Sequence, residues 1–124
     1  MTLLTGTGEV SPTGTLDVTR DIDLDQTSPA LIKAGSVKVH GWIIYNDSGA
    51  THYVKLYNKA TAPVIAEDTP VMTIGIKTLE TATFSSEIGI DFPLGLGWVC
   101  TTGIADNNTG APAANDCVAN IMYV

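Results

Sequence analysis

The sequence has few charged residues, and few of these are basic. Asp, Glu, Lys and Arg make up 15% of the 124 residues, and six Lys and Arg stand against thirteen Asp and Glu, which gives a formal net charge of −7. Binding to a nucleic-acid backbone or to an anionic membrane surface depends on clustered basic side chains. The composition therefore argues against both partners, and the low charge density is typical of a surface that partners partly cover.

Long apolar runs are missing as well. No stretch of the sequence reaches the length of a transmembrane helix. The first residues, Met1 to Thr5, contain neither the basic region nor the apolar region of a signal peptide. We therefore expect a protein that is made in a cytosol and stays there until it is released.

Catalytic and cofactor motifs are also lacking. The sequence contains no G-x-S-x-G nucleophile motif, no glycine-rich phosphate loop and no metalloprotease helix motif. A zinc site needs three or four ligands, so we expect His40 and His52 at the surface or the rim. A hydrolase built on paired carboxylates, such as Glu67 and Asp68 with Glu80, stays an alternative. We predict that the protein is not an enzyme and holds no cofactor or metal.

The sequence does contain short apolar segments separated by Gly, Pro, Asn, Asp and Ser, and no segment has a helical pattern. Alternation of apolar and polar residues is typical of half-buried strands. The predicted strands cover residues 16–25, 36–46, 51–58, 70–77, 81–85, 89–93, 95–104 and 116–124. About eight strands at this spacing predict an all-β fold, a single antiparallel β-sandwich of the jelly-roll type.

The N-terminal part differs from the rest. Residues 1–15 are rich in Thr and Gly and lack periodicity, which is typical of an extended arm. We divide the chain into an arm with one amphipathic strand, residues 1–30, and a sandwich domain, residues 31–124. In the strand of the arm, the residues expected on the buried face are Leu16, Val18, Ile22 and Leu24, and those on the opposite face are Asp17, Asp21, Asp23 and Asp25.

A row of carboxylates on one strand face repels itself, and such a row favours a basic partner or a cation. The D-x-D-x-D spacing is present, but Gln26 stands where a calcium loop needs glycine and no Glu follows at the twelfth position. Calcium, a basic protein surface and a plain solvated face are the alternatives. The candidate partner-binding residues are Leu16, Asp17, Val18, Asp21, Ile22, Asp23, Leu24 and Asp25.

The two cysteines, Cys100 and Cys117, lie on the last two predicted strands. Both share a strand face with apolar residues and nothing signals export, so buried free thiols are one expectation. A hairpin centred near residue 108 would place them opposite each other, so a cross-strand disulfide is the alternative. No His or cationic neighbour in the sequence activates Cys117 as a catalytic thiol.

Three aromatic residues suggest an alternative function. Tyr53 and Tyr57 are predicted on one face of a strand, and Trp42 lies on the adjacent strand. Exposed rings at these positions would form a platform on which a sugar can stack. In a sandwich, such residues equally belong to the core or to an interface.

Four stretches carry a resemblance to known proteins: Gly41–Thr51 (GWIIYNDSGAT), Val54–Pro63 (VKLYNKATAP), Asp68–Ile74 (DTPVMTI) and the ending Thr101–Val124. They resemble a group of small proteins encoded in the structural regions of tailed bacteriophages. The resemblance covers about residues 36–124 and does not include the arm. Its motifs mark strands and turns, so no functional residue is carried over.

The resemblance implies a structural virion protein, a head decoration (cement) protein with a β-sandwich body. Such a protein would bind the major capsid protein, stabilise the head and lie on the capsid surface after assembly in the host cytoplasm. Closed symmetry is usual for oligomers, and three-fold lattice positions would match a homotrimer. The alternative is a receptor- or carbohydrate-binding module of a phage fibre or tail.

Overall fold

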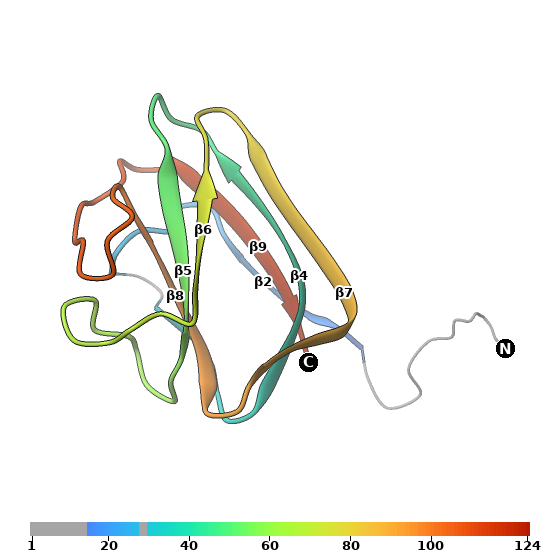
Figure 1. Ribbon diagram of the computed structural model, residues 1–124. Helices are drawn as coiled ribbons and strands as arrows, with labels where there is room; N and C mark the ends of the chain where they lie inside the picture. Colours follow the sequence, from blue (N-terminus) through green and yellow to red (C-terminus); the bar gives the residue numbers. More distant parts are fainter. Residues whose placement is uncertain (1–14, 28–29) are drawn as a thin grey trace, which may run out of the picture.

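The computed structural model describes residues 15–27 and 30–124, and these residues form eight strands and no helix (Figure 1). The strands are β2 Asp17–Asp21, β3 Leu31–Ala34, β4 Val37–Asn46, β5 His52–Asn58, β6 Met72–Ile76, β7 Thr81–Phe92, β8 Gly95–Thr101 and β9 Cys117–Tyr123. They pair in two antiparallel four-stranded sheets with the orders β2-β9-β4-β7 and β3-β8-β5-β6.

The order of the strands is that of a jelly roll. Every connection between consecutive described strands crosses from one sheet to the other, except β5 to β6, which stay in the same sheet. Eight strands arranged as a double-sheet sandwich in this way form a jelly roll. The predicted all-β, jelly-roll-like sandwich is therefore confirmed.

The core lies between the two sheets and is formed by every second residue of each strand. On β9, Cys117, Ala119, Ile121 and Tyr123 are buried, and the residues between them are half-exposed. β8 is buried along its whole length, which requires cover on both of its faces. The alternation read from the sequence therefore holds where one face of a strand meets the core.

β2 is shorter than predicted and faces the other way. The predicted strand over residues 16–25 ends at Asp21. The register places Val18 opposite Met122 and Thr19 opposite Ile121. Since directly opposed residues of two strands share a face, Thr19 faces the interior and Val18 faces outward.

The predicted buried face of this strand is therefore wrong for three of its four residues. Leu16, Val18 and Ile22 are 52%, 60% and 46% exposed, and Leu24 alone of the four is buried, at 1%. Leu24 follows the turn after β2, and its amide donates to the carbonyl of Cys117.

β2 is hydrogen-bonded to β9, so residues 17–21 belong to the sandwich, although the sequence predicts them as part of the arm. The predictions for residues 1–14 of the arm lie outside the described residues.

Two further strand boundaries differ from the prediction. β3 is a short strand that the sequence analysis does not predict, and the predicted strands 81–85 and 89–93 form the single strand β7. The two halves of β7 are joined by a bulge at residues 86–89 opposite His40. Gly89 has a φ of +86°, and a Cβ there would lie 3.1 Å from Cε1 of His40, so the bulge requires glycine at this position.

Candidate interaction surface

The outer face of the sheet β2-β9-β4-β7, here called the open face, carries exposed and half-exposed apolar side chains. By register, the side chains that point outward include Val18, Ile43, Tyr45, Val118 and Met122. Ile43 is 48% exposed although β4 is a central strand, and Val18 is 60% exposed. An apolar residue in the middle of a sheet stays this exposed when nothing covers the face, and no segment of the described residues does so here.

The open face is hollowed where β4, β7 and β9 meet. The residues that line a hollow of about 570 Å³ are Trp42, Ile43, Thr83, Phe84, Ser85 and Met122. None of these side chains is charged. The rings of Trp42 and Phe84 face the core beneath this hollow, because the two residues lie opposite each other and Trp42 belongs to the core. They lie 4.5 Å apart, tilted by 30°.

Gly41 lies on β4 next to Trp42, which lines this hollow. A Cβ at Gly41 would lie 2.6 Å from the carbonyl oxygen of Phe84 and 3.1 Å from Cε of Met122. Glycine therefore lets β4 and β7 approach closely while the Met122 side chain lies across the strand.

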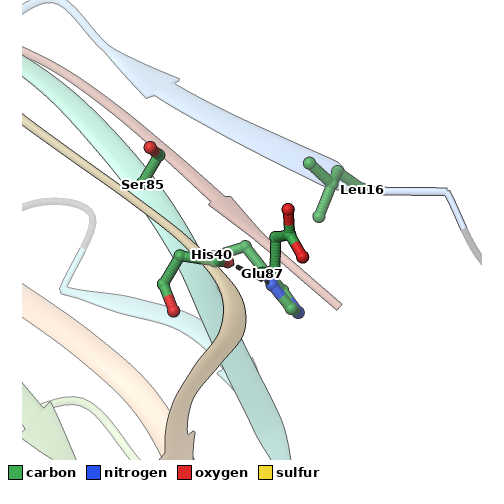
Figure 2. Close-up of a pocket in the computed structure, with 5 residues that line it drawn as sticks. Leu16, His40, Ser85 and Glu87 are labelled. Carbon is green, nitrogen blue, oxygen red and sulfur yellow. Dashed lines mark hydrogen bonds between the residues drawn. The ribbon is translucent and has the colours of Figure 1, made fainter. Parts of the chain in front are cut away.

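A second hollow, of about 520 Å³, adjoins the first through Ser85 and is lined by Leu16, His40, Ser85, Ser86 and Glu87 (Figure 2). Nδ1 of His40 lies 2.9 Å from the carbonyl oxygen of Ser86, which holds the ring against the bulge of β7. Glu87 is the charged residue at this end.

The opposite sheet has no such exposed face. On its central strand β5, the outward-pointing Lys55 and Tyr57 are 0% and 1% exposed. Nζ of Lys55 donates a hydrogen bond of 2.6 Å to the carbonyl oxygen of Ala105, so the loop between β8 and β9 covers this face. Burial lowers the pKa of Lys55, and the nearby carboxylate of Asp106 acts in the opposite direction.

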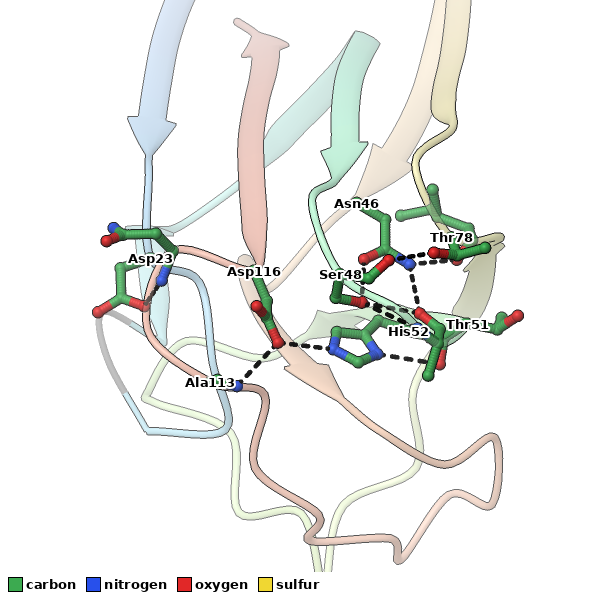
Figure 3. Close-up of polar contacts among 11 residues, drawn as sticks. Asp23, Asn46, Ser48, Thr51, His52, Thr78, Ala113 and Asp116 are labelled. Atoms are coloured by element: carbon green, nitrogen blue, oxygen red, sulfur yellow. Dashed lines mark hydrogen bonds and ion pairs between the residues drawn. The ribbon is translucent and has the colours of Figure 1, made fainter.

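Four loops meet at one end of the sandwich and are joined by polar contacts (Figure 3). Nε2 of His52 lies 3.2 Å from Oδ2 of Asp116, and Nδ1 lies 2.9 Å from the carbonyl oxygen of Thr51. Asp116 also accepts from the amide of Ala113 at 3.0 Å. Both neighbours of the ring are hydrogen-bond acceptors. His52 is 4% exposed, so its predicted surface position is wrong.

The other contacts of this end are made by amide and hydroxyl groups. Nδ2 of the buried Asn46 donates to the carbonyl oxygens of Ala50 and Ile76, each at 2.8 Å. Thr78 donates to the carbonyl oxygen of Ser48, and the amide of Asn115 donates to Asp23. These contacts hold the loops together. They do not place a serine or cysteine side chain against His52.

The predicted row of carboxylates does not form. Asp17 and Asp21 lie on β2, but Asp23 and Asp25 lie beyond its end. The Asp25 carboxylate accepts from the backbone and the hydroxyl of Thr27 at 2.8 and 2.9 Å, and Asp21 accepts from the amide of Asp23 at 2.8 Å. These Asp residues fold the turn after β2, and burial raises the pKa of Asp21.

The structure brings some of the candidate partner-binding residues to the open face. Val18 points outward from it, and Leu16 lines the second hollow. Ile22 is exposed in the turn, and Leu24 is buried. The sequence analysis does not single out Ile43 and Met122, which the register places on the open face.

Cys100 and Cys117 are both free and buried, on β8 and β9 in opposite sheets. β8 and β9 therefore do not form a hairpin, and the expectation that Cys100 and Cys117 lie opposite each other on paired strands is wrong. The thiol of Cys117 faces that of Cys100, and this contact together with burial raises the pKa of Cys117. A raised pKa keeps the thiol protonated and unreactive.

The predicted sugar platform is not formed. Tyr57 is 1% exposed, and Trp42, at 7%, points into the core from the other sheet. Tyr53 is the one half-exposed ring of the three.

Within residues 15–27 and 30–124, no group of three or more His, Cys, Asp or Glu side chains is placed to hold a metal ion. No helix long and apolar enough to cross a membrane occurs in the described part of the chain.

Comparisons with family models, curated proteins and solved structures find no match to this chain.

Proposed function

We propose that this chain is a structural virion protein of a tailed bacteriophage, a head decoration protein that binds the capsid shell through its open face. The observation that carries the proposal is the difference between the two sheets. One sheet is covered on its outside by the chain's own loop, so that Lys55 and Tyr57 are buried, whereas Ile43 on the central strand of the other sheet is 48% exposed.

The chemistry of the open face suits a permanent protein partner. Its hollow exposes an isoleucine and a methionine, and none of its lining residues is charged. Interface cores are depleted of charge and rich in aromatic residues and Met. The chain carries a net charge of −7, so an uncharged region is where a partner docks without desolvating carboxylates.

The fold and the sequence support the same class of function. Jelly rolls occur in viral capsid and lectin domains, and fold alone does not decide between these. The resemblance of residues 36–124 to small proteins from phage structural regions favours the virion. Binding to the shell needs no catalytic group.

The proposal is tested by co-sedimentation with undecorated heads, comparing Ile43→Lys with Ile104→Lys. Ile43 lines the hollow, and Ile104 is 65% exposed in the loop that covers the other sheet. A lysine at Ile43 places an unpaired charge in the docked interface, so we expect at least a tenfold loss of affinity, or about 1.4 kcal/mol.

Ile104→Lys makes the same change of side chain away from the open face, so we expect it to bind as the natural protein does. Equal binding by both variants would contradict docking through the open face. Retention of the natural protein on glycans, with no binding to heads, would favour the receptor-binding alternative.

A further inference from the structure

The two sides of the sandwich, where the sheets end, are closed to different degrees. One side is formed by the edge strands β2 and β3, and the other by the edge strands β6 and β7. Edge strands present unpaired backbone groups to solvent, and proteins cover them, charge them or pair them.

The β2–β3 side is covered and charged. The chain between these strands crosses from one sheet to the other, and Cys100 and Trp98 donate their amides to the carbonyl oxygens of Asp25 and Ala30 at 2.9 and 2.8 Å. Leu24 closes the core beneath this crossing and is 1% exposed. The edges themselves carry Asp17, Arg20, Asp21 and Lys33.

The β6–β7 side leaves part of the core exposed. Six hydrophobic residues pack against the core while remaining partly exposed, and five of them lie on these two strands: Met72, Ile74, Ala82, Phe84 and Ile90. The adjoining segments 72–76 and 81–85 contain no charged residue. Within the described part of the chain, no segment crosses this side to cover the core as the chain between β2 and β3 does on the other side.

Among residues 15–27 and 30–124, no segment pairs with the outer edge of residues 81–85. These residues pair with β4 and with no other described strand. The amide of Asn46 donates to the carbonyl oxygen of Glu80 at 3.0 Å. Because hydrogen-bonded and non-hydrogen-bonded pairs alternate in an antiparallel ladder, the backbone groups of Thr81, Thr83 and Ser85 point away from β4.

We propose that two copies of this chain associate through the β6–β7 side, with their β7 edges paired antiparallel about a two-fold axis at Thr83. Thr83 then lies opposite its own copy and Thr81 lies opposite Ser85, so the strand ladder continues from one molecule into the next. The bulge at residues 86–89 ends the pairing. The half-exposed core residues of each copy are covered by the other.

Charge identifies β7 as the edge that can pair with itself. An isologous contact places each residue opposite its symmetry mate, so a charged strand repels itself. The same pairing of β2 about Thr19 would set Asp17 opposite Asp21. Each molecule has a net charge of −7, but residues 81–85 contain no charged side chain, so pairing them places no like charges opposite each other. Thr83 and Ser85 also line the hollow of the open face, but the pairing uses their backbone groups. The inference does not rest on capsid binding, and its test measures the mass of the free protein, so it can fail without the proposed function failing.

The test is the molar mass of the purified full chain by light scattering and sedimentation over a range of concentrations. We expect the mass of two chains at high concentration, falling to one chain on dilution. Thr83→Asp and Thr83→Lys each place like charges opposite each other at the axis, so each should raise the dissociation constant by about fivefold or more.

An equimolar mixture of the two variants sets Asp opposite Lys, and we expect it to recover the two-chain mass. A variant that merely fails to fold would not be rescued in this way. Thr109→Asp and Thr109→Lys, at an exposed threonine of the loop between β8 and β9, serve as matched controls and should leave the mass unchanged. A single-chain mass at every concentration, a three-chain mass, or Thr83 variants that behave as the natural protein would each overturn the proposal.

Discussion

Tyr57 shows how burial of one polar side chain shapes stability. The residue is 1% exposed, and its hydroxyl has no hydrogen-bond partner among the described residues. Burial raises the pKa of Tyr57 to about 12, and the carboxylates of Asp106 and Asp68 act in the same direction. The folded protein therefore keeps the phenol protonated at pH values where an unfolded chain ionises it.

Tyr57→Phe is expected to flatten the alkaline part of the stability curve. In the natural protein, the raised pKa contributes stability below pH 10 that is lost as the pH rises from 10 to about 12. The variant lacks this loss, which amounts to at most about 3 kcal/mol. Near neutral pH we expect a change of less than about 1 kcal/mol, because the hydroxyl has no partner to lose.

Denaturant unfolding of both proteins at pH 8 and at pH 11 checks this prediction. Lys55, whose pKa burial lowers, is present in both proteins, so its contribution cancels in the comparison. If both proteins lost the same free energy of unfolding between pH 8 and pH 11, ionisation of Tyr57 would not be the cause of the loss.

At the scale of elements, alternation in the sequence predicts that a strand has two faces without saying which face meets the core. The two faces predicted for residues 52–58 agree with the structure, because β5 is a central strand and its inward Val54 and Leu56 are apolar. For β2 the prediction assigns the buried and the exposed face the wrong way round, because the orientation of this strand depends on its register with β9. There Thr19 reaches Tyr123 through a hydroxyl contact of 2.9 Å.

The candidate site was only partly predictable for the same reason. Val18 was a candidate partner-binding residue, but it was expected on a buried face. The hollow forms where Ile43, Thr83 and Met122, far apart in the sequence, come together. Their meeting is set by strand pairings that sequence periodicity does not encode.

Gly41→Ala tests the close approach of β4 and β7. The added methyl group would lie 2.6 Å from a backbone oxygen of Phe84, so the strands must move apart. We expect a loss of about 1–3 kcal/mol in the free energy of unfolding, which is the usual cost of overpacking. Thermal or denaturant unfolding measures it.

Gly49→Ala is the matched control, because nothing lies within 4 Å of a Cβ at Gly49. The same loss in both variants would indicate a general effect of removing glycine, and it would contradict the steric explanation.

At the scale of the whole molecule, the jelly roll is unevenly covered. The sheet β3-β8-β5-β6 is covered by the chain's own loop, and the β2–β3 side is closed by the crossing around Leu24. The open face and the β6–β7 side keep apolar groups exposed. A chain with 15% charged residues accordingly has two surfaces suited to protein partners, and we assign one to the shell and one to a second copy.

The central claim is that this protein decorates a capsid, and the most direct measurement is the copy number bound per head. Purified protein is titrated onto undecorated heads, and the bound fraction is sedimented and quantified. The account predicts saturable binding at a fixed number of copies that matches one class of lattice position. Failure to bind heads at any concentration, or binding that rises without saturation, would contradict it.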